Sequence, residues 1–258
     1  MRKLLLASAL FLIGICSAFG QGYEKKSFTA ADGTALNYRL LAPEAENGEK
    51  YPLVLFLHGA GERGNDNEIH LLHGSQMFLN PVNRDKYPAY VLFPQCPSEG
   101  YWAFVNRPDS FTEMTGCDDI TPVLQAVMEL VHTYLENTLI DKSRVYVMGI
   151  SMGGMATYDL VARFPETFAA AIPICGAVNP ERLSVAEGVN FRIYHGDADP
   201  IVPVECSRIA YRALKKAGVD VEYKEFPGCG HDSWNPAFNQ PDFMEWLFKQ
   251  KKSRKYMK

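Results

Sequence analysis

The sequence has no excess of basic residues, no closely paired cysteines and no long apolar run beyond its first 20 residues. Its 258 residues include 26 lysines and arginines against 30 aspartates and glutamates, so the formal net charge is −4. A nucleic-acid-binding surface needs a basic footprint, so this balance argues against such a partner. No two of the 6 cysteines have the C-x-x-C spacing of zinc ribbons and redox motifs. Repeats, low-complexity tracts and linker-like segments are also absent, which indicates one domain.

The N-terminal segment has the pattern of a secretory signal peptide. Residues 2–3 are Arg-Lys, residues 4–15 are almost wholly apolar, and residues 18–20 place small side chains before a cleavage point. The apolar run is too short to span a bilayer comfortably. We therefore expect residues 1–20 to be removed, leaving one catalytic domain over residues 21–258. The mature chain is expected to be secreted or periplasmic, with no stable membrane insertion.

Cysteine usage does not define a disulfide framework. Cys16 lies in the expected signal peptide, and an odd number of cysteines remains, so at least one thiol is unpaired even where export permits disulfides. The spacing leaves the pairing open among Cys96, Cys117, Cys175, Cys206 and Cys229.

Short runs of β-branched and aromatic residues alternate with helical patterns through the rest of the chain. This alternation predicts an α/β fold, with a mostly parallel eight-stranded sheet covered by helices on both faces. The first two strands are expected to form a hairpin around an Asp-Gly turn, Asp32-Gly33. The expected strands are Lys25–Thr29, Leu36–Leu41, Leu53–Leu57, Tyr90–Pro94, Val145–Gly149, Ala169–Ile174, Phe191–Tyr194 and Val221–Phe226.

Helices are expected between these strands. Asp119 or Thr121 can cap the clearest one, with Pro122 in the first turn, where its missing N–H costs nothing. Apolar residues then recur at helical spacing and give this helix one apolar face. Further helices are expected over Met152–Phe164, Val204–Ala217 with Gly218 as its C-terminal cap, and Asp242–Lys251.

The segment Gly149–Gly153 has the pattern G-x-S-x-G between an expected strand and an expected helix. In this setting the serine sits on a sharp, strained turn, so its hydroxyl stands clear at the carboxyl end of the sheet. The two glycines let the strand and the helix pass closely without side-chain clashes. Ser151 is therefore the expected nucleophile.

A serine nucleophile needs a histidine to take its proton and a carboxylate to orient that histidine. When the serine lies on such a strand–turn–helix, its partners follow in the order carboxylate, then histidine. Only His195 and His231 follow Ser151, and His195 comes before the candidate acids rather than after them. His231 lies in a glycine-containing loop after the last expected strand, so we expect it to be the base.

The acid is expected directly after the strand Phe191–Tyr194, where Asp197 and Asp199 both qualify. Asp199 is preferred, because residues 199–203 resemble the D-x-x-V-P acid loop of serine esterases. Asp197 would then form the turn by hydrogen bonding to its own backbone.

Acyl transfer also needs N–H donors for the negative charge that develops on the substrate oxygen. The Met152 N–H, directly after the nucleophile, is one expected donor. The second is expected from the loop after the strand Leu53–Leu57, at Ala60 or, failing that, at Gly61. His58 is expected to brace this loop rather than to take part in the reaction.

These motifs, in this order, resemble the α/β-hydrolase superfamily over nearly the whole mature chain. More narrowly, residues 55–64 and 149–154 resemble secreted esterases of the feruloyl esterase and polyhydroxybutyrate depolymerase-like group. Dienelactone hydrolases are similar in outline but have a cysteine where this chain has Ser151. Prolyl oligopeptidases share the catalytic domain but carry a large propeller, for which this chain has no room. The resemblance implies a serine esterase without a cofactor.

The surroundings of the expected site give weaker signals. Only Cys175–Val189 separates two expected strands at the place where lipases insert a lid, so no substantial lid is expected. Trp102 and Trp234 are candidate pocket walls, because aromatic rings stack on aryl and sugar faces. Glu62 either hydrogen-bonds substrate or pairs with Arg63.

No metal site is expected. His70 and His73 are three residues apart, but no carboxylate–histidine set surrounds them, so a solvated face is the favoured interpretation. The sequence thus predicts a secreted serine esterase that forms an acyl-enzyme. By analogy with the family, its substrates are small-molecule or polysaccharide-borne esters, preferably acyl or feruloyl esters of plant polysaccharide. A peptidase of the prolyl oligopeptidase type and a general short-chain carboxylesterase are the alternatives.

Overall fold

An eight-stranded sheet forms the centre of the computed structural model, which describes residues 22–44, 49–103, 119–253 and 255. The strand order is β1-β2-β4-β3-β5-β6-β7-β8. β2 pairs antiparallel with β1 and with β4, and all remaining pairs are parallel. The strands are β1 (Glu24–Thr29), β2 (Ala35–Leu41), β3 (Tyr51–Leu57), β4 (Tyr90–Gln95), β5 (Ile140–Ile150), β6 (Ala170–Ile174), β7 (Asn190–Gly196) and β8 (Val221–Phe226). The predicted sheet is confirmed, including its initial hairpin.

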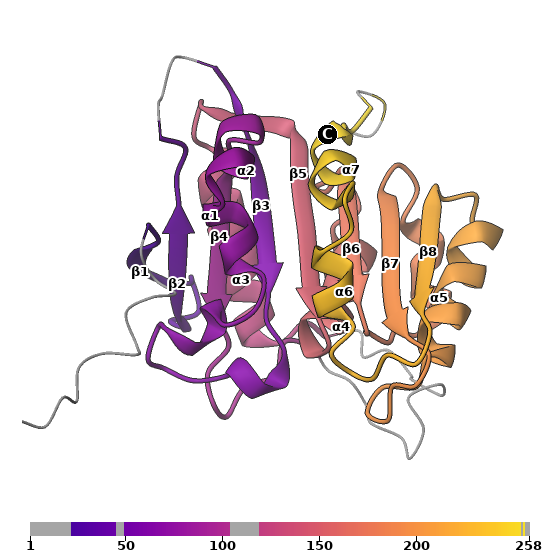
Figure 1. Ribbon diagram of the computed structural model, residues 1–258. Helices are drawn as coiled ribbons and strands as arrows, with labels where there is room; N and C mark the ends of the chain where they lie inside the picture. Colours follow the sequence, from indigo (N-terminus) through magenta and orange to yellow (C-terminus); the bar gives the residue numbers. More distant parts are fainter. Residues whose placement is uncertain (1–21, 45–48, 104–118, 254, 256–258) are drawn as a thin grey trace, which may run out of the picture.

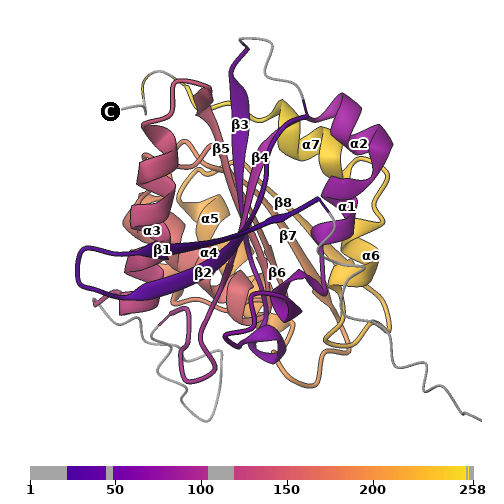
Figure 2. The ribbon, with the colours of Figure 1, turned by 90° about the vertical axis from the view of Figure 1, so that its left-hand side faces the viewer.

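Helices cover both faces of this sheet (Figures 1 and 2), as predicted. Helices α3, α4 and α5 lie on one face, and α1, α2, α6 and α7 lie on the other. Each face has its own apolar core, which explains why β3, β4 and β6 are buried along their whole length. The α-helices are α1 (Ser75–Leu79), α2 (Pro81–Lys86), α3 (Pro122–Leu135), α4 (Met152–Arg163), α5 (Glu205–Lys216), α6 (Trp234–Phe238) and α7 (Phe243–Lys249).

The start of α3 resolves one open alternative. Thr121 is the cap, because its side-chain oxygen accepts a hydrogen bond from the Leu124 N–H at 3.1 Å. Pro122 occupies the first turn, as predicted. Helices α1, α2 and α6 were not predicted, since five or six residues are too few for a periodic apolar pattern.

The connection between β6 and β7 is short. It holds a single 3-10 turn, η5 (Pro180–Val185), which packs against α4 and α5. This agrees with the expectation that no substantial lid is inserted there. The expected signal peptide, residues 1–20, lies outside the described residues. None of the helices that the structure describes is both long and apolar enough to cross a membrane.

Candidate active site

Ser151 lies between the end of β5 and the start of α4, at the carboxyl edge of the parallel strands. Its φ of 52° and ψ of −115° are a strained conformation for a residue with a side chain. The neighbouring glycines are sterically required. A Cβ at Gly153 would lie 1.9 Å from the Leu57 carbonyl oxygen, and one at Gly149 would lie 2.4 Å from the Gly153 carbonyl oxygen. The turn therefore presents the hydroxyl at the end of the sheet while strand and helix remain in close contact.

His231 reaches Ser151 from the loop between β8 and α6. Its Nε2 lies 2.9 Å from the Ser151 Oγ, and its Nδ1 lies 2.8 Å from the Asp199 Oδ2. A carboxylate only accepts hydrogen bonds, so Nδ1 carries the proton and Nε2 is left free to accept the serine proton. Three segments that are far apart in sequence thus form one connected chain of hydrogen bonds.

Asp199 is held by four donors. Its Oδ1 accepts hydrogen bonds from the backbone N–H groups of Ile201 and Val202, at 2.8 and 2.9 Å. Its Oδ2 accepts from His231 at 2.8 Å and faces the His195 Nε2 at 3.2 Å. Burial by itself raises the pKa of this carboxyl, but the hydrogen bonds outweigh burial and hold its pKa well below the usual value. Asp199 is therefore ionised and rigidly oriented.

Asp197 lies outside this chain of hydrogen bonds. Its Oδ1 accepts from the Gly228 N–H at 2.6 Å, so it ties the acid loop to the loop that carries His231. The expectation that it bonds to its own backbone is wrong, because the neighbouring loop offers a free donor at the required distance. Of the two candidate acids, the structure places only Asp199 against the imidazole.

The expected oxyanion donors lie at two helical starts. Met152 is the first residue of α4, and Ala60 is the first residue of the 3-10 turn η2 (Ala60–Glu62). N–H groups in the first turn of a helix have no partner within that helix, and this is why helix starts can supply donors to anionic groups.

His58 braces the loop that carries Ala60. Its Nε2 accepts from the Cys96 N–H at 2.9 Å, so its Nδ1 carries the proton and donates to the Gly59 carbonyl at 2.6 Å. Its own carbonyl accepts from the Trp102 indole at 3.1 Å. Burial lowers the pKa of His58 to about 4, so the ring is neutral. The arrangement agrees with the bracing role that was expected.

The two predicted aromatic walls differ in position. Trp102 is fully buried beside His58, so the expectation that it contacts substrate is wrong: its indole N–H satisfies a backbone carbonyl in the core instead. Trp234 opens α6 and meets the His231 ring edge-on, with ring centroids 5.6 Å apart. Only Trp234, of these two tryptophans, lies beside the base.

Glu62 does not pair with Arg63. The Arg63 guanidinium donates to the carbonyls of Ala60 and Gly100, both at 3.0 Å, and so stiffens the loop. Glu62 instead approaches the Nε2 of His73, at 3.8 Å from its Oε1, and its other oxygen is buried without a hydrogen-bond partner. Glu62 therefore lies between the oxyanion loop and His73.

His195 is a residue whose place the sequence analysis missed. It was considered only as a possible base, yet it is fully buried at the end of β7 and contacts the acid Asp199. The signal was its position, four residues before the acid and directly after an apolar strand.

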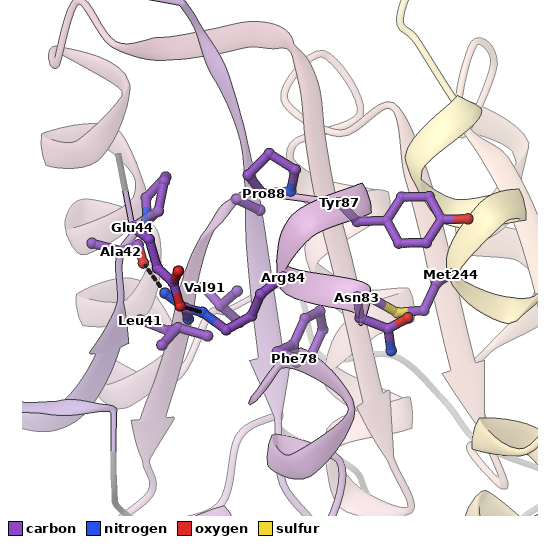
Figure 3. Close-up of a pocket in the computed structure, with 12 residues that line it drawn as sticks. Leu41, Ala42, Glu44, Phe78, Asn83, Arg84, Tyr87, Pro88, Val91 and Met244 are labelled. Carbon is purple, nitrogen blue, oxygen red and sulfur yellow. Dashed lines mark hydrogen bonds and ion pairs between the residues drawn. The ribbon is translucent and has the colours of Figure 1, made fainter. Parts of the chain in front are cut away.

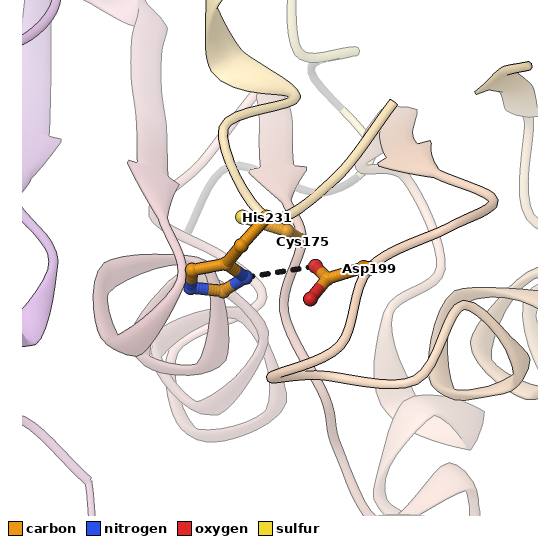
Figure 4. A group of neighbouring side chains, drawn as sticks. All are labelled: Cys175, Asp199 and His231. Atoms are coloured by element: carbon orange, nitrogen blue, oxygen red, sulfur yellow. Dashed lines mark hydrogen bonds and ion pairs between the residues drawn. The ribbon is translucent and has the colours of Figure 1, made fainter. Parts of the chain in front are cut away.

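One group of potential metal ligands exists among the residues that the structure describes. It consists of Cys175, Asp199 and His231, whose ligand atoms lie within 4.8 Å of one another (Figure 4). Two of these residues belong to the hydrogen-bond chain, and the carboxylate is already occupied by donors. Burial raises the pKa of the Cys175 thiol far above the ordinary value, which disfavours the thiolate that a metal needs.

The expectation of a solvated face for His70 is wrong. His70 is completely buried in η3 (Ile69–Leu71), packed near His58 with ring centroids 6.1 Å apart, and neither ring nitrogen has a hydrogen-bond partner. Burial lowers its pKa to about 3. His73 remains partly exposed and packs beside Trp234 with the rings tilted at 45° and their centroids 5.1 Å apart.

A separate small hollow lies on the face that α2 covers (Figure 3). Arg84 crosses it and donates to the Ala42 carbonyl at 3.1 Å and to Glu44 at 2.7 Å. The hollow has a volume of about 10 Å³, enough for one water molecule, so it is not a substrate pocket. None of its lining residues belongs to the chain of hydrogen bonds around Ser151.

The mostly parallel sheet, the serine on its strained strand-to-helix turn and the histidine loop after the last strand define an α/β hydrolase. Within that class, the chain belongs to the phospholipase/carboxylesterase family, whose model matches residues 42–241.

Known relatives support an esterase. A probable carboxylesterase SOBER1-like of Arabidopsis thaliana is 30% identical over 216 residues, which cover 77% of this chain and 78% of that protein. Feruloyl esterase B of Neurospora crassa is 29% identical over 130 residues, or 50% of this chain and 40% of that protein. The crystal structure of a thermostable esterase matches with a TM-score of 0.82 and 33% identity, over 91% of this chain and 64% of that chain. This chain therefore spans less than two thirds of the length of the feruloyl esterase and of the thermostable esterase.

Proposed function

We propose that the protein is an exported serine carboxylesterase that works through an acyl-enzyme. The Ser151 Oγ attacks the ester carbonyl carbon while the His231 Nε2 takes its proton. Asp199 keeps the imidazole in the required tautomer and stabilises it when it becomes charged. The N–H groups of Ala60 and Met152 stabilise the oxyanion, and each such donor contributes about 3 kcal/mol to lowering the barrier.

The second half of the reaction follows from the same geometry. The imidazolium returns its proton to the alkoxide as the carbon–oxygen bond breaks, and the alcohol leaves. His231 then takes a proton from water as the water oxygen attacks the acyl carbon. The bond from that carbon to the Ser151 Oγ breaks, the imidazolium returns its proton to the Oγ, and the acid is released. The observation that carries this proposal is the continuous hydrogen bonding from Ser151 through His231 to Asp199, at 2.9 and 2.8 Å.

A fluorophosphonate probe tests the nucleophile directly. Wild-type protein is expected to be labelled at Ser151 and to hydrolyse p-nitrophenyl acetate, whereas folded Ser151→Ala does neither. An unlabelled, folded wild type would indicate a binding protein on this scaffold and would overturn the proposal. An aminoacyl-anilide substrate, assayed in parallel, separates an esterase from a peptidase.

For the substrate, we propose acyl or feruloyl esters borne on plant polysaccharide. The likeness to a feruloyl esterase over half of the chain supports this class, and so does Trp234, a partly buried aromatic residue beside His231. A panel of feruloyl, acetyl-xylan and short alkyl esters tests the proposal. The highest kcat/KM on simple short-chain esters would favour the alternative, a general carboxylesterase, which the names of the plant relatives support.

Export is proposed from residues 1–20, with the catalytic domain over residues 21–258. Expression of the full chain with fractionation, followed by N-terminal sequencing of the exported protein, is expected to give Gln21 as the first residue. Retention of the intact chain in the cytoplasm would contradict this part of the proposal.

A further inference from the structure

A second imidazole, that of His195, contacts the Asp199 carboxylate. His195 is fully buried, and its Nε2 lies 3.2 Å from the Asp199 Oδ2 and 2.9 Å from the Val202 carbonyl oxygen. On the other side of the ring, its Nδ1 lies 2.7 Å from the Oγ of Ser207, in α5. All three contacts are with buried residues.

These neighbours determine where the proton of His195 lies. A carbonyl oxygen can only accept, so the Nε2 beside Val202 must carry a hydrogen. Nδ1 is hydrogen-bonded to the Ser207 hydroxyl, which donates to it when Nε2 carries the only ring hydrogen. The Nε2 hydrogen of His195 is therefore shared between the Val202 carbonyl at 2.9 Å and Asp199 Oδ2 at 3.2 Å, and Ser207 holds the ring from its other side.

The hydrogen bond from His195 affects Asp199 Oδ2, the oxygen that faces His231. Asp199 Oδ2 accepts from His231 on one side and from His195 on the other, while the two backbone N–H groups hold Oδ1. The carboxylate consequently has no free direction in which to rotate. The His195 N–H also withdraws electron density from Oδ2. Oδ2 therefore stabilises a protonated His231 less strongly than it would without this hydrogen bond.

We propose that His195 is a positioning residue of the ester hydrolysis reaction, acting through Asp199 on the orientation and basicity of His231. The inference rests on the proposed function of Ser151, His231 and Asp199. If His195 only filled the core, its replacement would not change the pH dependence of the reaction. The pH profile therefore distinguishes a positioning role from a packing role.

Two substitutions at this position test the role. His195→Leu removes the donor, whereas the side-chain amide nitrogen of Gln in His195→Gln can reach the Nε2 position and donate. With p-nitrophenyl acetate, His195→Leu is expected to lower kcat about tenfold, as the loss of an orienting partner does at metal-bound histidines, with little change in KM. The acid limb of its kcat/KM profile is expected to move to higher pH, because Asp199 Oδ2 regains charge. His195→Gln is expected to restore both values towards wild type.

Ser207→Ala provides a second route if His195→Leu does not fold. Without the Ser207 hydroxyl, the His195 ring is less firmly held, so a smaller shift of the acid limb in the same direction is expected. Other titratable groups around the two imidazoles and their partners include Tyr158, Cys175, Cys206, Glu225, Cys229 and Asp232. All variants retain them, so the difference between profiles isolates the effect of His195.

The outcomes are distinct. A folded His195→Leu protein whose acid limb coincides with that of wild type overturns the proposal, whatever its kcat, and so does equal loss of kcat in His195→Gln. If His195→Leu cannot be obtained, an unshifted Ser207→Ala profile overturns it. Failure of the underlying function appears separately, as wild-type inactivity or as activity that persists in Ser151→Ala.

Discussion

At the scale of single residues, two aspartates two positions apart have different environments. Asp199 faces the imidazole of His231 and is buried with four donors, whereas Asp197 is exposed and accepts from the Gly228 N–H in the next loop. The side chains are chemically identical, so the difference comes from which donors each one meets. This contrast can be tested by neutralising each carboxylate in turn.

Asp199→Asn is expected to lower kcat for ester hydrolysis by about 10⁴-fold, the loss seen when the acid of a serine–histidine–aspartate triad is replaced by its amide. The amide can donate to Nδ1, which favours the wrong tautomer of His231. Asp197→Asn is the matched control and is expected to stay within a few-fold of wild type, because its amide oxygen can still accept from Gly228. Comparable losses in both variants would contradict the assignment of the acid.

The buried histidines make stability depend on pH. Burial lowers the pKa values of His58 and His70 from 6.5 to about 4 and about 3, so the unfolded chain binds protons before the folded one as pH falls. Their contribution to stability is complete above pH 6.5 and is lost as pH falls towards 4 for His58 and towards 3 for His70. His70→Met is expected to reduce the slope of unfolding free energy against pH by about 1.4 kcal/mol per unit in this window.

Urea unfolding between pH 4 and 7 measures that slope. His132→Gln, at an exposed position on α3, is the control and is expected to leave the slope unchanged. A His70→Met slope equal to that of wild type would show that His70 is not kept neutral by the fold.

At the scale of elements, the decisive feature is the close packing of α4 on β3 at the nucleophile turn. This proximity holds Ser151 at φ 52° without a glycine. It leaves no room for a side chain at Gly153, where a Cβ would overlap the Leu57 carbonyl. The turn is therefore maintained by packing between elements and not by the local backbone preference of serine.

Gly153→Ala is expected to lower the free energy of unfolding by about 3 kcal/mol, the upper range for overpacking, because a backbone carbonyl must move. Gly61→Ala is the stability control, since nothing lies within 4 Å of its Cβ position. Thermal or urea unfolding of both variants provides the measurement. A Gly153→Ala protein as stable as Gly61→Ala would show that helix and strand are less closely packed than described.

At the scale of the whole molecule, the expected chemistry gathers at the carboxyl ends of the parallel strands, and other contacts tie down the opposite end (Figure 1). Lys252, in the segment after α7, is buried there. Its N–H donates to the Ser143 carbonyl at 2.8 Å, and its ammonium donates to the Phe168 carbonyl at 2.8 Å. One residue thus links the C-terminal segment to β5 through its backbone and to the loop before β6 through its side chain.

Lys252→Ala is expected to lower the free energy of unfolding by about 2 kcal/mol, the range for a hydrogen bond to a charged group. The kcat for p-nitrophenyl acetate is expected to remain unchanged, because none of these contacts reaches Ser151. Lys251→Ala, at an exposed neighbouring position, is the control and is expected to change neither quantity. A fall in kcat for folded Lys252→Ala would reveal coupling between the two ends of the sheet.

Features that depend on residues near one another in sequence could be predicted from the sequence. The eight strands, the Asp-Gly hairpin turn, the start of α3 at one of two candidate caps and the serine turn arise from local periodicity, turn chemistry and cap preferences. The order of Ser151, the acid loop and His231 along the chain was also informative. In a parallel sheet, the ends of successive strands meet at one edge, so linear order predicts proximity there.

What only the tertiary structure decided is how each side chain is surrounded. Sequence patterns favoured Asp199 without excluding Asp197, offered Trp102 as a pocket wall, left His70 in solvent and considered His195 only as a possible base. Burial and hydrogen-bond partners depend on which distant segments come together, such as β7 and α5 around His195 or the oxyanion loop around Trp102. Local sequence carries no record of those partners, because they are supplied by residues 12 positions away for His195 and 44 positions away for Trp102.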